Sequence, residues 1–98
     1  MKNILFTLAL LVSFVSFGQT ADEYFDSGYD KAEAKDYYGA IADYTKAIEI
    51  NPNYEDAYTN RGITKEKLGD LNGACVDWKK AAEFGDTNAA EWVAKQCN

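Results

Sequence analysis

The chain has 98 residues, which is enough for one small domain. Sixteen acidic residues against ten basic ones give a formal net charge of −6 at pH 7. Binding to phosphate backbones and to anionic membrane surfaces depends on Lys and Arg, so this balance argues against nucleic acid as a partner. The sequence contains no histidine and no glycine-rich phosphate loop. Without them, the usual Ser-His or Cys-His pairs and nucleotide sites cannot form, and we predict neither an enzyme nor a cofactor.

The first 18 residues have the features of a secretory signal peptide. Met1-Lys2-Asn3 is a short positive start, and the run 4–17 has fourteen apolar or small residues without a charge. Ser16 and Gly18 provide the small side chains that a cleavage site needs. The alternative is a membrane anchor, although a spanning helix needs about 20 residues. We therefore expect a signal peptide at 1–18, a mature domain at 19–98 with net charge −7, and a periplasmic or extracellular location.

The rest of the chain predicts helices and no strand. Thr20 and Glu23 have the spacing of a capping box, which would open a first helix over 21–34. Asp36 is placed to cap a second helix over 37–50, whose apolar residues recur at spacings of three and four. Asn51-Pro52-Asn53 then predicts a turn, because proline lacks the amide that a continuing helix would need.

Three more helices are predicted after this turn. Asn53 is placed to cap the third, over 54–68, and Gly69-Asp70 forms a turn like Lys35-Asp36 before the fourth, over 71–84. Gly85 is typical of the position just past a helix end. Asp86-Thr87 would cap a fifth, shorter helix over 88–97.

The segment 54–84 repeats the sequence that lies 34 positions earlier, without a gap. A fixed period in this range indicates stacked units of supersecondary structure, each of which buries its apolar face against the next. Eleven residues are identical in the two copies, and in the second copy they are Asp56, Tyr58, Gly62, Lys65, Asp70, Gly73, Ala74, Asp77, Lys80, Ala81 and Glu83.

These residues resemble the tetratricopeptide repeat family, with repeat one at 21–54, repeat two at 55–88 and a capping helix at 88–97. The resemblance implies an all-α fold, a short right-handed α-solenoid of two helix-turn-helix repeats plus the cap. Two departures from the family pattern are Asp86, where a closing proline is usual, and lysine at positions 31 and 65, which are usually aromatic. The residues that the resemblance assigns to packing are Tyr24, Gly28, Ala40, Tyr44, Ala47, Pro52, Tyr58, Gly62, Ala74, Trp78, Ala81 and, in the cap, Trp92.

The resemblance also implies a function, because family members bind protein or peptide partners on a concave face lined by the first helix of each pair. Members that grip a terminal carboxylate use Lys and Asn where this chain has Phe25 and Tyr29, so we expect an extended peptide with apolar and basic side chains instead. The alternative is that these two aromatics pack against the neighbouring helix or against an N-terminal partner. Carried over one by one, the inward positions are Asp22, Phe25, Tyr29, Ala32, Glu33, Asp56, Thr59, Asn60, Ile63, Glu66 and Lys67, with Ala90 and Val93 added by the cap.

We therefore interpret the chain as an exported adaptor or assembly scaffold without catalysis of its own. A second hypothesis is a structural protein that self-associates through its open N-terminal helix edge, which would make it a homo-oligomer. A third, less favoured hypothesis is an accessory protein that binds a small ligand between its helices.

The two cysteines lie symmetrically about the expected turn at Asp86. Cys75 is eleven residues before it and Cys97 eleven after it, so an antiparallel hairpin would place them at the same height. An exported protein meets an oxidising compartment, and a disulfide would close a loop of 22 residues, worth roughly 3 kcal/mol in the chain-entropy model. We predict this disulfide. The alternative is that Cys75 is an ordinary thiol in the core and that Cys97 lies at a frayed chain end. A metal site is not expected, since zinc needs about four ligands.

Overall fold

The computed structural model describes residues 19–98, so the predicted signal peptide lies outside the described residues. The helices are α2 (Ala21–Glu33), α3 (Tyr37–Ile50), α4 (Glu55–Lys67), α5 (Leu71–Glu83) and α6 (Thr87–Gln96). Residues 19–98 contain no strand, and none of their helices has the length and apolar character to cross a membrane. The prediction of five helices and no strand is confirmed.

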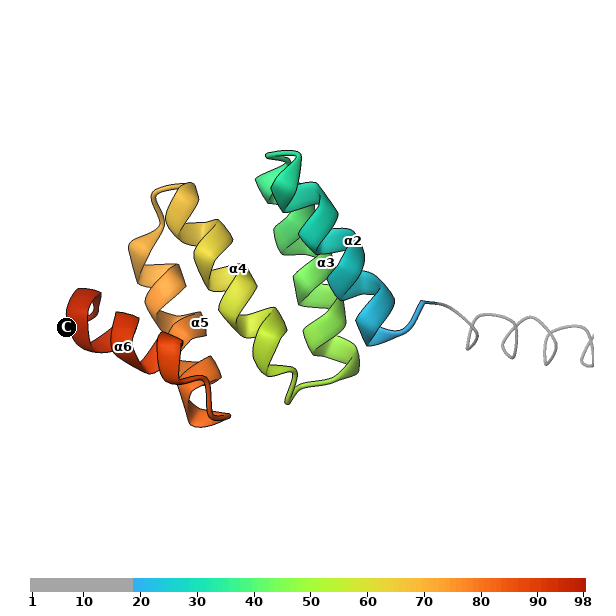
Figure 1. The fold of residues 1–98 in the computed structure, drawn as a ribbon. Helices are drawn as coiled ribbons and strands as arrows, with labels where there is room; N and C mark the ends of the chain where they lie inside the picture. Colours follow the sequence, from blue (N-terminus) through green and yellow to red (C-terminus); the bar gives the residue numbers. More distant parts are fainter. Residues whose placement is uncertain (1–18) are drawn as a thin grey trace, which may run out of the picture.

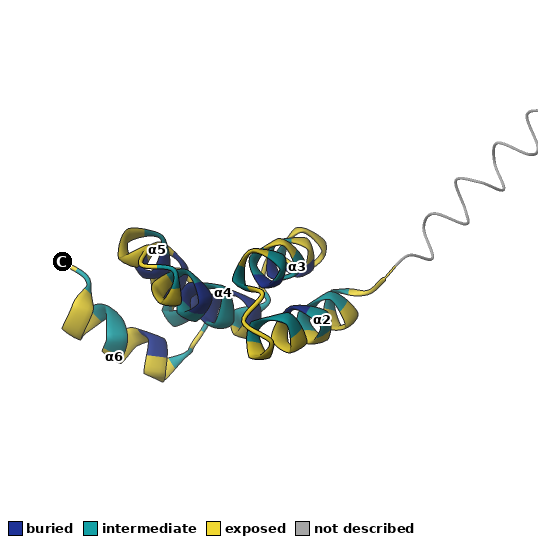
Figure 2. Ribbon diagram, turned by 90° about the horizontal axis from the view of Figure 1, so that it is seen from above, coloured by how far each residue is buried: buried dark blue, intermediate teal, exposed yellow. Residues whose placement is uncertain are grey.

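The helices follow one another as a stack of hairpins (Figure 1). α2 pairs with α3, α4 pairs with α5, and α6 packs against α5. Seen from above, α4 lies between the α2–α3 pair and the α5–α6 pair, and buried residues face the neighbouring helices (Figure 2). The chain therefore forms the predicted short all-α solenoid, with α4 as its middle layer.

Most helix starts follow the predicted caps. The Thr20 hydroxyl accepts a hydrogen bond from the Glu23 backbone N–H, and the Glu23 carboxylate accepts one from the Thr20 N–H. Three aspartates cap α3, α5 and α6 in the same way, each accepting a hydrogen bond from a backbone N–H three residues later. The pairs are Asp36 with Gly39, Asp70 with Gly73, and Asp86 with Ala89. These bonds satisfy backbone donors that the first turn of a helix leaves free.

The predicted cap of the third helix is wrong. The N-cap of α4 is Tyr54, which makes no side-chain capping bond. Asn53 instead donates its backbone N–H to the Asn51 side-chain oxygen at 3.1 Å. The asparagine before the proline thus closes the turn around Pro52, and the next helix begins two residues later than Asn53.

Glycine allows each pair of helices to approach closely. A Cβ atom at Gly28 would lie 2.8 Å from the Tyr44 ring, and one at Gly62 would lie 2.6 Å from Trp78 Nε1. Both aromatic rings are only 1% exposed, so neither can move aside into solvent. The repeated glycine therefore seats the repeated aromatic residue against the first helix of its own hairpin, as the packing prediction requires.

We expect Gly62→Ala to destabilise the protein, although a helix-interior Gly→Ala change ordinarily stabilises by up to about 1 kcal/mol. The added methyl group would overlap the indole of Trp78, and such overpacking costs about 1 to 3 kcal/mol. Urea unfolding measures the change in unfolding free energy. Asn88→Ala on the exposed side of α6 is the control and should change stability by less than about 0.5 kcal/mol. Equal stability of Gly62→Ala and the parent would contradict the packing described here.

A buried ion-pair network joins three helices. Asp77 of α5 is 1% exposed and accepts two hydrogen bonds from the Arg61 guanidinium, at 2.9 and 2.7 Å. Lys65 Nζ lies 3.0 Å from the same carboxylate. A third guanidinium nitrogen of Arg61 donates to the Thr45 hydroxyl of α3 at 3.0 Å. Through Arg61, one carboxylate therefore holds α4 to α5 and repeat two to repeat one.

The first repeat has a weaker version of the same contact. Asp43 accepts a hydrogen bond from the Ser27 hydroxyl at 2.6 Å and pairs with Lys31 Nζ at 3.0 Å. Its side chain is 14% exposed and that of Lys31 is 44% exposed. Lysine at positions 31 and 65, a departure from the family pattern, is explained by this pairing with the aspartate of the following helix.

The C-terminal helix is held by packing and by a covalent bond. Ala89 is fully buried against the preceding hairpin, and the rings of Trp78 and Trp92 lie 5.2 Å apart. The structure joins Cys75 and Cys97 in a disulfide, with Cα atoms 5.8 Å apart, as the sequence predicts. α6 therefore covers the apolar side of the second hairpin.

Candidate functional site

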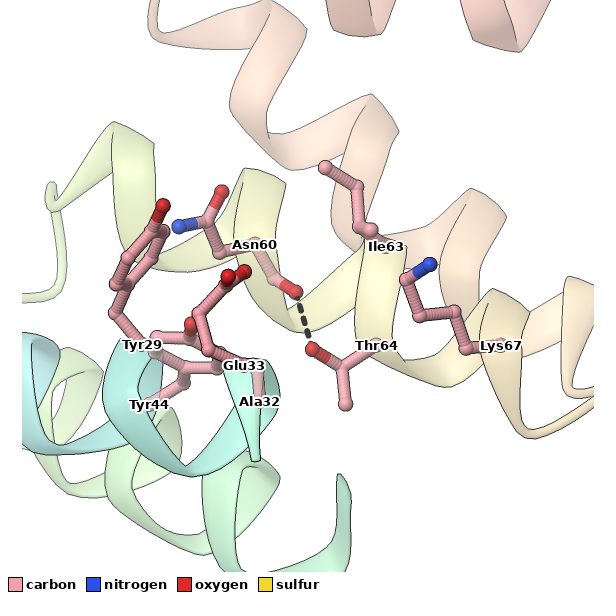
Figure 3. Close-up of a pocket in the computed structure, with 8 residues that line it drawn as sticks. All are labelled: Tyr29, Ala32, Glu33, Tyr44, Asn60, Ile63, Thr64 and Lys67. Carbon is pink, nitrogen blue, oxygen red and sulfur yellow. Dashed lines mark hydrogen bonds between the residues drawn. The ribbon is translucent and has the colours of Figure 1, made fainter. Parts of the chain in front are cut away.

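A pocket opens between the first helices of the two repeats. Its volume is about 190 Å³. Figure 3 shows side chains of α2 facing Asn60 and Thr64 of α4, with Ile63 and Lys67 on the same helix. The residues that line the pocket are Tyr29, Ala32, Glu33, Tyr44, Asn60, Ile63, Thr64 and Lys67.

The pocket is mainly apolar inside and polar at its edge. Ala32 and Ile63 are apolar lining residues on its two sides, and Tyr44 is a buried lining residue from α3 that is 1% exposed. The Tyr29 ring is 50% exposed. Glu33 and Lys67 are both exposed, so the pocket has one charge of each sign among its lining residues.

Six of the thirteen residues predicted to line the concave face also line this pocket: Tyr29, Ala32, Glu33, Asn60, Ile63 and Lys67. Asp56 and Glu66 are exposed residues of α4 outside the pocket lining. Asp22 is exposed near the start of α2 and accepts a hydrogen bond from the Tyr54 hydroxyl at 2.6 Å. The structure therefore brings six of the thirteen predicted residues together around one cavity.

Phe25 packs against two aromatic rings of the neighbouring segments. Its ring lies 5.2 Å from that of Tyr54 and 5.6 Å from that of Tyr44. This is the packing role that the sequence left open as an alternative for both aromatics. Tyr29, one helical turn later, remains half exposed and lines the pocket.

Thr59 is a correction to the predicted concave surface, because its side chain is buried. Thr59 is 9% exposed and its hydroxyl contacts the Glu55 carbonyl and the Asp86 carboxylate. The same carboxylate group of Asp86 caps α6. Thr59 therefore connects α4 to the start of the capping helix and is not available to a partner.

Two pocket residues were not among the predicted binding residues. The sequence assigns Tyr44 to packing alone, yet it also lines the cavity. Thr64 donates its hydroxyl to the Asn60 carbonyl at 2.8 Å and presents the rest of its side chain to the pocket. The available signal was the position of Thr64, four residues after Asn60 and therefore on the same side of α4.

Burial and nearby acids raise the pKa of two tyrosines, Tyr44 in the pocket lining and Tyr54. Burial raises the pKa of Tyr44 to about 12, an effect opposed by a hydrogen bond with Asn60 and reinforced by the charges of Glu33 and Asp30. The pKa of Tyr54 is also raised, by burial and by its hydrogen bond to Asp22. In both cases the folded protein favours the neutral phenol over the phenolate.

These shifts predict alkaline destabilisation. A pKa raised in the folded state gives stability that is fully present below the unfolded pKa of 10.0 and is lost as the pH rises toward about 12. We therefore expect the thermal midpoint to fall between pH 10 and 12, and to fall less in Tyr44→Phe, which has no phenol to ionise there. The measurement is thermal unfolding by circular dichroism. Parallel pH curves for the two proteins would contradict the contribution assigned to Tyr44.

The size of the pocket limits what it can hold. Sites for drug-sized molecules and cofactors are usually about 300 to 1,000 Å³, and this pocket is about 190 Å³. A cavity of about 150 Å³ can hold a benzene ring. The pocket therefore fits one apolar side chain of a partner better than a separate small molecule, which argues against the hypothesis of a ligand accessory protein.

Comparisons with known proteins agree with this architecture. A family model described as TPR repeat matches residues 21–69, which is half of the chain. Among curated proteins no match was found. The fold is similar to that in the crystal structure of MamA, with a TM-score of 0.71 and 21% sequence identity over 80% of this chain. The matched region is 50% of the MamA chain, so this chain spans about half of that protein's length.

Proposed function

Because the chain belongs to the tetratricopeptide repeat family, whose repeats generally mediate protein–protein interactions, we propose that it is an exported adaptor without catalytic activity. Its partner segment binds along the groove between α2 and α4. The observation that carries this proposal is the pocket of about 190 Å³ on that face, which is lined by residues of both repeats.

Packing explains the other large side chains of the two first helices. Phe25 is stacked against Tyr54, and Tyr58 packs against Phe84 while its hydroxyl donates to the Pro52 carbonyl. Tyr29 makes no such stacking contact among the aromatic pairs of residues 19–98. A half-exposed tyrosine beside an apolar pocket is a frequent anchor in protein interfaces.

Export is proposed from the sequence of residues 1–18, and the disulfide between Cys75 and Cys97 supports it. Structural disulfides persist in oxidising compartments and are rare where glutathione keeps thiols reduced. We therefore propose a periplasmic or extracellular location. Mass spectrometry of the protein from its native envelope or medium tests this: a mature chain that begins at Gln19 is expected, and a chain that retains Met1 to Gly18 would contradict cleavage.

Site-specific photo-crosslinking tests the proposed binding face. A photoreactive phenylalanine analogue at position 29 should cross-link to a protein partner in the producing cell. The matched control is position 38, because Tyr38 is a tyrosine that is 77% exposed on α3 and does not line the pocket. Cross-links from position 38 and none from position 29 would place the interaction on another face and overturn the proposal.

A further inference from the structure

We propose that the segment bound in the groove is a basic one, with a single apolar side chain in the pocket and Lys or Arg residues along the N-terminal part of α2. This inference rests on the proposed function and adds the chemistry of the partner. Three observations support the proposal. They are the size of the pocket, a line of acidic side chains next to the pocket, and the uneven distribution of charged side chains along the groove.

The anchor is a single aliphatic or small aromatic side chain. The pocket has room for one such group, and Ala32, Ile63 and the buried ring of Tyr44 supply apolar contacts inside it. The Asn60 amide, which hydrogen-bonds Tyr44, has further donor and acceptor capacity for an extended peptide backbone. Burying one apolar side chain of this size contributes enough to change affinity by about 10 to 100-fold.

Acidic residues extend the site along α2. Asp22 and Asp26 precede Tyr29 and Glu33 at helical spacings of four and three, so these four side chains share one face of the helix. All four are exposed. The only basic residue of α2 is Lys31, which pairs with Asp43 at 3.0 Å, so it does not neutralise this face. Asp56, also exposed, adds a carboxylate at the start of α4.

The charged side chains are also distributed unevenly along the groove. Lys67 lines the pocket near the C-terminal end of α4, whereas the acids at positions 22, 26 and 56 belong to the N-terminal halves of the first helices. A cationic residue of the partner is therefore attracted toward the helix starts, whereas near the pocket the charges of Glu33 and Lys67 offset each other. The length of helix between Glu33 and Asp22 is about 16 Å at a rise of 1.5 Å per residue. An extended peptide covers this length with about five residues. The basic residues thus lie within about five positions of the anchor, on one side of it.

Charge complementarity favours this occupant over others of the same size. An acidic peptide would place its carboxylates beside Asp22, Asp26 and Glu33, and like charges held close together weaken binding. Nucleic acids and anionic membrane surfaces are disfavoured in the same way. A basic segment gains attraction along the whole line, which is strongest at low ionic strength.

Fluorescence anisotropy with short labelled peptides, blocked at both ends, tests the proposal. The first peptide carries two lysines and one leucine separated by serines; the second has glutamates in place of the lysines; the third has serine in place of the leucine. The first should bind the mature protein at least about tenfold more tightly than either of the others. Its affinity should fall as salt is added.

Two variants assign the binding to the groove. Asp26→Asn with Glu33→Gln removes two charges outside the first turn of α2, and should weaken the lysine–leucine peptide about three to tenfold at low salt. The matched control is Glu49→Gln with Glu83→Gln, which makes the same charge change at two exposed positions of α3 and α5 and should leave affinity unchanged. Ala32→Trp fills the pocket and should abolish binding, with circular dichroism confirming the helical fold.

The outcomes separate this inference from the proposed function. Equal binding of the glutamate and lysine peptides, with loss in Ala32→Trp, would overturn the basic preference and leave the groove as the binding site. Equal effects of the two charge variants would also overturn it. Binding by none of the peptides would reject this partner chemistry, while cross-linking from position 29 would still decide the proposed function.

Discussion

Replacing Asp77 by alanine should lower the free energy of unfolding by about 3 to 5 kcal/mol, a large part of the stability of a small domain. The carboxylate is 1% exposed and pairs with both Arg61 and Lys65. Its loss would leave two cations, 16% and 22% exposed, without their partner. Arg61 would also lose the contact that orients it toward Thr45 of the first repeat.

Asp43→Ala is the matched control, because Asp43 is the same position in the first repeat. Its partner Lys31 is 44% exposed, and pairs of this kind contribute about 0.2 to 1 kcal/mol. Both variants are measured by urea unfolding with the disulfide intact. Should Asp77→Ala fail to fold, Asp77→Asn keeps one hydrogen-bond acceptor and should show a smaller loss. Equal losses at positions 77 and 43 would contradict the assigned role of the buried network.

Removing the disulfide should have the second largest effect. Cys75→Ala with Cys97→Ala opens a loop of 22 residues, which the chain-entropy model values at roughly 3 kcal/mol. Without the bridge, the ten residues of α6 are held by Ala89, Trp92 and the Asp86 cap. We expect α6 to separate from α5 before the rest of the domain unfolds, since isolated short helices are unstable in water.

Tryptophan fluorescence reports this separation directly, because Trp78 and Trp92 are the only two tryptophans of the chain and their rings lie 5.2 Å apart. A reductant should shift the emission of the parent to longer wavelength at moderate urea concentration. The same reductant should leave the double alanine variant unchanged. A parent protein whose urea curve is identical with and without reductant would show that the bridge does not hold the cap.

The fold can be predicted because the residues that determine its packing occur twice in the sequence. The period of 34 residues places the same glycine, alanine and aromatic residues at the same contacts twice, and aspartates at positions 36, 70 and 86 mark helix starts. Helix boundaries are accurate to within one or two residues. The exception at Asn53 arises because two asparagines flank Pro52, and local sequence does not decide which of them closes the turn.

The candidate site was only partly predictable, because it depends on contacts between repeats. The sequence periodicity predicts which face of α4 carries Asn60 and Ile63. It does not predict that the neighbouring Thr59 is buried against Asp86, because the position of Asp86 depends on the turn between α5 and α6. The same limit applies to the network around Asp77. Its identity with Asp43 is visible in the sequence, whereas its bond to Arg61 requires α4 and α5 to be packed.

We propose that the groove between α2 and α4 is the binding surface of this stack. Two-dimensional NMR of ¹⁵N-labelled residues 19–98, titrated with the lysine–leucine peptide, tests it most directly. We expect the largest amide shifts at Tyr29, Glu33, Asn60 and Ile63, and we expect these shifts to disappear in Ala32→Trp. Shifts centred on the exposed residues Tyr38 and Val76, with the groove unaffected, would contradict it.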